Sequence, residues 1–148
     1  MKNYVACLII LVLTAVASEA QKSPDKLGVV SYTFRTSFQK DVAATLDTIK
    51  GMGITNIEFS NLFGRTAADI KKLLEERGMQ CTSFGTSYDE VLTKTQQVAE
   101  NAKTLGASFV RVAWIPHDNK VPFTIETAKK AVEDFNTIGK ILKEQYEL

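Results

Sequence analysis

Glycines that separate a helical pattern from an apolar strand recur along this chain at a nearly constant interval. Gly53, Gly78 and Gly106 lie 25 and 28 residues apart, and each follows an amphipathic segment and precedes a run of apolar residues. Glycine just past the last helical turn is a common way to end a helix. The repeat therefore predicts consecutive strand–helix units, whose helices return the chain to the same end of one parallel sheet.

Four such units are expected in the 148 residues. A closed barrel built on this pattern has eight units and roughly 250 residues. The predicted strands cover residues 27–34, 54–59, 79–84 and 108–114. The predicted helices cover residues 41–52, 66–77 and 87–105, and a last one follows a loop at 115–123. That last helix is capped by Thr124, and its apolar stripe is predicted as Ile125, Ala128, Val132, Phe135, Gly139 and Leu142.

The amino terminus has the features of a secretory signal peptide. Lys2 precedes an uncharged apolar run at 5–16, and small residues at suitable spacing follow. A membrane anchor is the alternative, but the run is shorter than the roughly 18 residues that a span needs. We therefore expect a signal peptide at 1–20, cut after residue 17 or 20, a linker at 21–26, and a secreted or periplasmic mature protein.

Composition and motifs argue against several other classes of protein. The net charge is +1 and no basic run occurs, so neither nucleic acid nor, after cleavage, a membrane is expected as a partner. Cys81 is the only cysteine after the predicted cleavage, which excludes an internal disulfide. A flavodoxin-like domain is a weaker alternative, because no glycine-rich phosphate loop follows the first predicted strand.

Three segments resemble the sugar phosphate isomerase/epimerase family, the xylose-isomerase-like TIM barrels. Residues 27–35 (LGVVSYTFR) are similar to the family's first strand, and residues 106–114 (GASFVRVAW) to its fourth. Residues 51–60 (GMGITNIEFS) resemble its second strand, with a Gly-apolar-x-x-(Ile/Val)-Glu pattern. The resemblance implies an α/β fold in which residues 27–148 form a parallel (βα)4 unit, the N-terminal half of a TIM barrel.

The resemblance also implies a reaction and a cofactor. Family members are isomerases or epimerases of a sugar or cyclitol, in which a divalent metal (Mn, Mg, Co or Zn) polarises oxygens and carboxylates move a proton beside a carbonyl. Their metal ligands lie mostly on strands five to eight, and this chain ends at Leu148, where the fifth strand would begin. No metal ligand can be carried over, so we expect a truncated protein with weak or no activity.

Glu58 is the candidate catalytic residue. In a parallel barrel the working groups lie at the carboxyl ends of the strands, where Glu58 is predicted. A carboxylate between Ile57 and Phe59 is costly to bury without a partner. It is either a base, a metal ligand or an anchor for a sugar hydroxyl, or the structural ion-pair partner of Arg111 on a nearby strand.

Four further residues near strand ends are candidate substrate contacts. Trp114 could stack on the C–H face of a sugar or pack in the core, and His117 could face substrate or simply be exposed. Tyr32 and Phe34 are expected to share one face of the first strand, in either the pocket or the core. The alternative to an enzyme is a secreted carbohydrate-binding module, or a half-barrel that self-associates through its open sheet edges.

Overall fold

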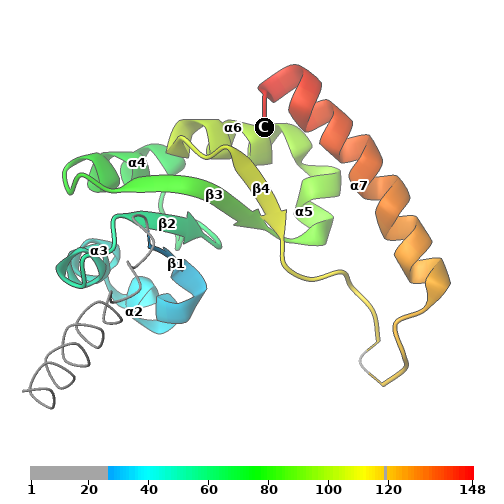
Figure 1. Ribbon diagram of the computed structural model, residues 1–148, viewed down its shortest axis with the longest axis horizontal. Coiled ribbons are helices and arrows are strands. Elements are labelled where there is room, and N and C mark those ends of the chain that lie inside the picture. Colours follow the sequence, from blue (N-terminus) through cyan, green and yellow to red (C-terminus); the bar gives the residue numbers. More distant parts are fainter. Residues whose placement is uncertain (1–26, 119) are drawn as a thin grey trace, which may run out of the picture.

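The computed structural model describes residues 27–118 and 120–148, and the predicted signal peptide and linker lie outside that range. Four parallel strands form one sheet in the order β1-β2-β3-β4 (Figure 1). They are β1 (Gly28–Val30), β2 (Asn56–Phe59), β3 (Gln80–Thr86) and β4 (Phe109–Val112). Each strand pairs with the next one along the chain, and the β2–β3 register shifts between Ile57 and Glu58. The expected α/β architecture with four parallel units is confirmed.

The helices pack in chain order along one face of this sheet, with α4 against α6 and α6 against α7 (Figure 1). Their bounds are α2 (Arg35–Lys40), α3 (Val42–Gly51), α4 (Ala67–Glu75), α5 (Tyr88–Thr93), α6 (Thr95–Leu105) and α7 (Ile125–Tyr146), with a 3₁₀ turn η1 (Ser31–Phe34). The described residues leave the opposite face of the sheet uncovered. That face would be the interior of a barrel.

Alternation along the strands separates the core from the open face. In β2, Ile57 and Phe59 are fully buried against the helices, whereas Asn56 and Glu58 are only partly buried on the other face. Burying an apolar side chain of this size stabilises the fold by roughly 1.5–3 kcal/mol. The core therefore lies between sheet and helices, and the open face carries polar groups.

Helix boundaries follow the punctuation seen in the sequence. Thr66 and Ser87 form capping boxes with Asp69 and Glu90, at the starts of α4 and α5. Gly106 ends α6 in the left-handed conformation, with φ of 81°, which glycine adopts without strain. The expected strand–helix repeat is thus built as predicted at these positions.

Two predictions about the ends of the sheet's outer strands were wrong. The first strand ends at Val30 rather than Phe34, because the chain turns into η1 and the buried Ser31 hydroxyl bonds to the end of β2. Tyr32 and Phe34 therefore do not share a strand face. The fourth strand ends at Val112 rather than Trp114, because its partner β3 ends at Thr86, opposite Val112.

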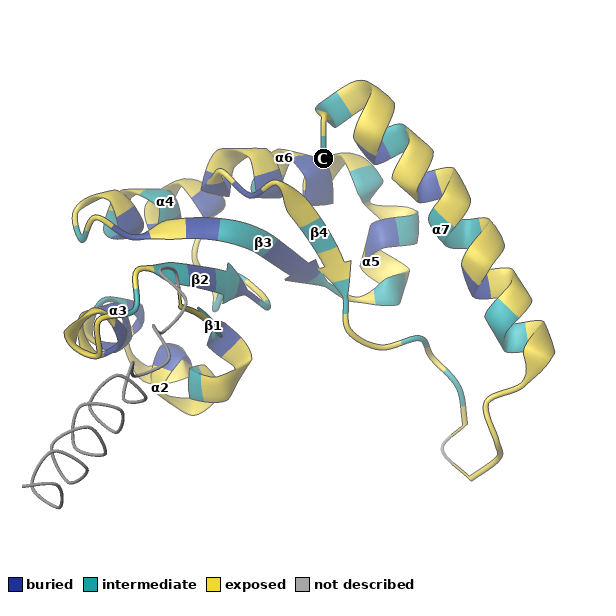
Figure 2. Ribbon diagram, in the orientation of Figure 1, coloured by how far each residue is buried: buried dark blue, intermediate teal, exposed yellow. Residues whose placement is uncertain are grey.

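Two predictions about helices also need correction. The single helix expected at 87–105 is broken at Lys94, where the hydroxyls of Thr93 and Thr95 bond to carbonyls one turn back and compete with regular helix bonding. In α7 the expected apolar stripe was wrong at Ile125, Val132 and Gly139, which are exposed. Ile125 and Val132 are exposed (Figure 2), because the start of α7 extends beyond the sheet, and the buried residues are Ala131, Ile138 and Leu142.

Candidate functional site

The carboxyl ends of the four strands surround a cavity. Its volume is about 540 Å³, within the range of small-molecule sites. Its walls combine aromatic faces with hydroxyl and guanidinium groups. Lining residues include Val30, Tyr32, Ser60, Thr86, Arg111 and Trp114. We call this cavity the mouth.

Glu58 lies on the open face below the mouth and is paired with Arg111. The Arg111 Nε donates to Glu58 Oε1 at 2.6 Å, and Nη2 approaches the same oxygen at 2.6 Å. The pair spans β3, where Ser83 and Gly85 are in register with Glu58 and Arg111 and leave room for the long side chains. Within the described chain Oε2 accepts no hydrogen bond, and Glu58 is not among the residues that line the mouth.

Two contacts fix the rim between β1, β2 and β3. The Ser60 amide donates to Ser31 Oγ at 2.8 Å, and the two hydroxyls lie 2.9 Å apart. At Gly85 a Cβ atom would lie 3.0 Å from the Ser60 Cα, tighter than nine in ten real Cβ contacts. Glycine at that position lets β2 and β3 approach closely. These contacts join the ends of β1, β2 and β3 at the rim.

Trp114 belongs to an aromatic stack in the loop after β4. Its ring lies parallel to His117 with centroids 4.4 Å apart, and Phe123 meets the other side of His117 edge-on at 5.1 Å. The Trp114 residue is 54% exposed and lines the mouth, so the alternative of a plain core tryptophan is wrong. His117 does not line the mouth. Its Nδ1 hydrogen-bonds to the Ile115 carbonyl oxygen at 2.8 Å, and its ring stacks against Trp114.

The other two predicted substrate contacts, Tyr32 and Phe34, lie in different parts of the structure. Tyr32 is exposed and lines the mouth, with the Arg35 guanidinium 4.5 Å from its ring centroid. Phe34 instead packs against the core and borders a hollow between α2 and α3, together with Ser37 and Thr48. The structure thus brings Tyr32 and Trp114 together with Arg111, and it places Phe34 elsewhere.

Sequence reasoning missed the polar group where α5 meets α7. Tyr88 lines the mouth, and its hydroxyl donates to Asp134, which also accepts from Lys130 Nζ at 2.9 and 3.0 Å. The hydrogen bond to Asp134 raises the pKa of Tyr88 to about 12. The Tyr88 and Lys130 contacts lower the pKa of Asp134. The capping box at Ser87 was the one sequence signal that predicted the start of α5 directly after β3.

The described residues do not by themselves fit a divalent metal. Across 27–118 and 120–148, no three His, Cys, Asp or Glu side chains come together as ligands. Glu58 is engaged by Arg111, and Asp118 Oδ1 accepts from the Lys120 amide at 2.9 Å. No reaction step is therefore derived through a metal. In the same part of the chain no helix is long and apolar enough to cross a membrane.

Comparison with known proteins identifies the architecture. No family model matches the sequence, and no curated protein matches it either. A solved structure, a sugar phosphate isomerase/epimerase from Parabacteroides distasonis ATCC 8503, matches 85% of this chain with a TM-score of 0.62 and 19% sequence identity. The fold is half of a TIM barrel. The chain spans about half the length of that solved protein, since the match covers 50% of it.

Proposed function

We propose that the mouth binds a sugar or cyclitol, and that the chain forms the substrate-side half of an isomerase or epimerase barrel. One observation carries the proposal: an exposed tryptophan and a ring of hydroxyl and guanidinium groups line a 540 Å³ cavity at the carboxyl ends of parallel strands. Aromatic faces suit the C–H surfaces of sugars, and hydroxyls suit their polar edges. The name of the similar solved structure supports the same class of ligand.

Each candidate residue has a distinct role in this proposal. Trp114 stacks on the ligand, and His117 holds the indole in place by stacking behind it. Tyr32 forms the opposite aromatic wall. Glu58 receives a ligand hydroxyl, or a proton beside a carbonyl, at its second oxygen, while Arg111 fixes the orientation of the carboxylate.

The family reaction would need groups beyond those described. Divalent metal (Mn, Mg, Co or Zn) belongs to the reaction that the resemblance implies, and the described side chains do not assemble a site for it. We therefore propose that this chain alone binds its ligand but has weak or no isomerase turnover. Metal-dependent turnover on the order of 1 per second would contradict that statement.

The proposed setting is outside the cytoplasm. Residues 1–20 have the charge, apolar run and small residues of a cleaved signal peptide. Sequencing the amino terminus of the protein from culture medium or periplasm tests this directly. A mature chain beginning at residue 18 or 21 is expected, and an uncleaved cytoplasmic chain would contradict it.

A second candidate function is a non-enzymatic half-barrel that pairs with a second copy. Within the described chain β1 and β4 each have one unpaired edge, and the β4 residue Phe109 is 67% exposed on the open face. Two copies related by a two-fold axis along the barrel would pair β4 of one with β1 of the other. The net charge of +1 offers little repulsion. A monomer in light scattering at high concentration would contradict this candidate.

Trp114 provides the test of sugar binding, since it is the only tryptophan in the chain. Its emission is expected to change on titration with glucose, xylose and myo-inositol. Tyr32→Ala should weaken the response about fivefold, the loss of roughly 1 kcal/mol of ring contact. Phe109→Ala is the matched control, an exposed aromatic at the opposite end of the sheet, and should change nothing. An unchanged emission with all these ligands would overturn the proposed function.

A further inference from the structure

A second, smaller cleft adjoins the mouth on its outer side. Its volume is about 300 Å³, and it lies between the loop after β2 and the helices α5 and α6. It shares Ser60, Asn61 and Thr86 with the mouth, so the two hollows meet at the ends of β2 and β3. We call this hollow the side cleft.

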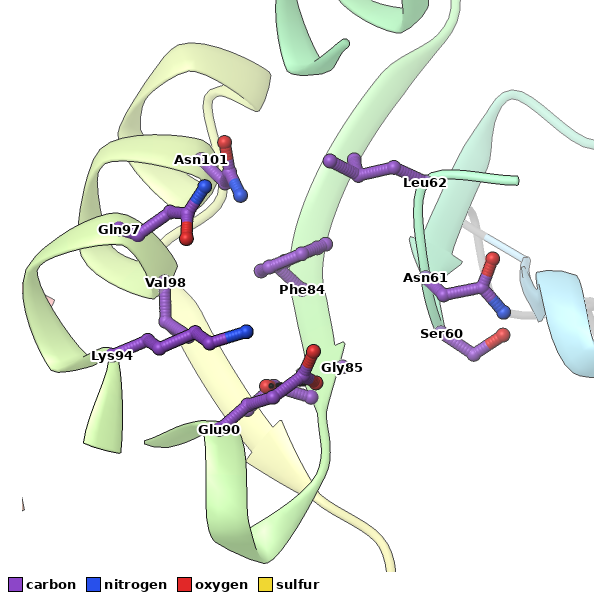
Figure 3. A pocket seen from close by; sticks show the side chains of 11 residues that line it. Ser60, Asn61, Leu62, Phe84, Gly85, Glu90, Lys94, Gln97, Val98 and Asn101 are labelled. Atoms are coloured by element: carbon purple, nitrogen blue, oxygen red, sulfur yellow. Dashed lines mark hydrogen bonds between the residues drawn. The ribbon is translucent and has the colours of Figure 1, made fainter. Parts of the chain in front are cut away.

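One wall of the side cleft is a stripe of polar side chains (Figure 3). Lys94, Gln97 and Asn101 follow one another at helical spacing along α6 and its N-cap and extend toward Phe84. In the described chain none of the three makes a side-chain hydrogen bond. Gln96, on the neighbouring face, donates instead to Glu100 at 2.8 Å. The amine and two carboxamides are thus available to a ligand as donors and acceptors.

The charged side chains of the cleft indicate which ligand charge it favours. Glu90 is held by the hydroxyls of Ser87 and Thr86, at 3.1 and 3.2 Å. Bonds from Ser87 lower its pKa, so its carboxylate is ionised at neutral pH. Lys94 faces the same cleft with a positive charge. The two charges balance, so neither an anion nor a cation is favoured over a neutral, hydrogen-bonding molecule.

The floor of the cleft is apolar. Leu62 extends toward Phe84 from the loop after β2, and Val98 lines the α6 side (Figure 3). An apolar floor beneath carboxamides, an amine and a carboxylate suits a ring with a C–H face and hydroxyl edges. The mouth offers the same combination, in a larger space.

We infer that the side cleft binds a second, neutral polyhydroxylated ring, so that the natural ligand is a two-ring glycoside rather than a single sugar. The inference rests on the proposed function, since the first ring occupies the mouth beside Trp114. Lys94, Gln97 and Asn101 then determine specificity for the second ring. None of them contacts the first.

The test compares one-ring and two-ring ligands on the same protein. Trp114 emission is titrated with glucose and xylose, and then with cellobiose, maltose and trehalose. At least one disaccharide should bind about tenfold or more tightly than either monosaccharide. The double substitution Gln97→Ala with Asn101→Ala should remove that advantage and leave monosaccharide binding unchanged. Gln96→Ala is the matched control, because its amide faces away from the cleft, and should leave both unchanged.

The outcomes separate this inference from the proposed function. If monosaccharides bind and no disaccharide binds more tightly, or if the double variant keeps the disaccharide advantage, the side cleft inference is wrong and the mouth stands. If no sugar changes Trp114 emission, or the backbone amide shifts of the labelled protein, at up to about 100 mM, far above millimolar affinity, both are wrong. Cooperative melting of the variants near the wild-type temperature confirms that they are folded.

Discussion

The centre of the sheet and its β4–α7 side are built differently. Around β2 and β3, Phe59 is fully buried, packs edge-on against Phe38 and Phe63, and is covered by helices. On β4, Phe109 is two-thirds exposed, and the first half of α7 extends into solvent with Val132 uncovered (Figure 2). This difference indicates that the packing that stabilises the fold is concentrated around β2 and β3. The β4 side carries Trp114 and is where we propose that ligands bind.

The largest difference is expected between two phenylalanines. Phe59→Ala should reduce the free energy of unfolding by about 3–5 kcal/mol, because it empties a fully packed site. Phe109→Ala should change it by no more than about 0.5 kcal/mol, because the ring is largely in water. Urea denaturation measures both. Similar losses at the two positions would remove the distinction between the regions.

Two glycines give the next largest contrast. Gly85→Ala places a methyl group 3.0 Å from the Ser60 Cα and 3.3 Å from the Phe59 carbonyl, and should cost about 1–3 kcal/mol. Gly139→Ala on α7 meets nothing within 4 Å and should stabilise the protein by about 0.5–1 kcal/mol through helix propensity. In the same denaturation assay, Gly85→Ala should lower the free energy of unfolding and Gly139→Ala should raise it. A tolerated Gly85→Ala would mean that β2 and β3 are not tightly joined.

The Glu58–Arg111 pair connects the two regions. Breaking it should change the free energy of unfolding and the sugar affinity to different extents. Its side chains are 14% and 42% exposed, so the pair is partly screened by solvent. Glu58→Gln should therefore cost no more than about 1 kcal/mol, rather than the roughly 3–5 kcal/mol of a fully buried pair. Sugar affinity measured by Trp114 emission should fall several-fold.

The matched control breaks an ion pair on the helix side. Asp47→Asn removes the negative charge and one of the two oxygens that accept from Arg77 at 2.8 and 3.1 Å, at residues that do not line the mouth. Sugar affinity should be unchanged in this variant. Normal affinity in Glu58→Gln together with a large stability loss would end the functional interpretation of Glu58.

The sequence predicted the centre of the molecule better than its edges. Strand β2 and helix α4 matched their expected positions, because their patterns depend on local caps and on a helix packed against the strand. The error at residues 31–34 came from a tertiary contact, since Ser31 is drawn into a turn by Ser60, 29 residues away. Tyr32 and Phe34 were consequently placed on one face, and only Tyr32 reaches the mouth.

The site residues on the β4 side depended on contacts between distant segments. The ion pair of Glu58 with Arg111 was anticipated as an alternative, because both lie on predicted strands. The hydrogen bond from Tyr88 to Asp134 joins residues 46 positions apart, and no pattern in the sequence predicts it. The stack of His117 between Trp114 and Phe123 depends on a loop conformation that strand and helix periodicity does not encode.

The smallest expected effect concerns the bond that joins α5 to α7. Because the pKa of Tyr88 is raised from 10 to about 12, its contribution to stability is full below pH 10 and is lost as the pH rises toward 12. Tyrosinate absorbance should contain one late phase near pH 12, absent in Tyr88→Phe. Tyr32→Phe is the control and should leave that phase in place. Titration of every tyrosine near pH 10 would contradict the contact.

The central claim, that ligands enter at the carboxyl ends of the strands on the β4 side, is tested most directly by amide chemical-shift mapping. The labelled protein is titrated with the sugar that most strongly changes Trp114 emission. We expect the largest shifts at Ser60, Thr86, Ala113 and Trp114 around the mouth. Amides at the opposite end of the sheet, such as those of Asn56 and Phe109, should be unchanged. Shifts centred at that opposite end, or spread evenly over the sheet, would contradict the account.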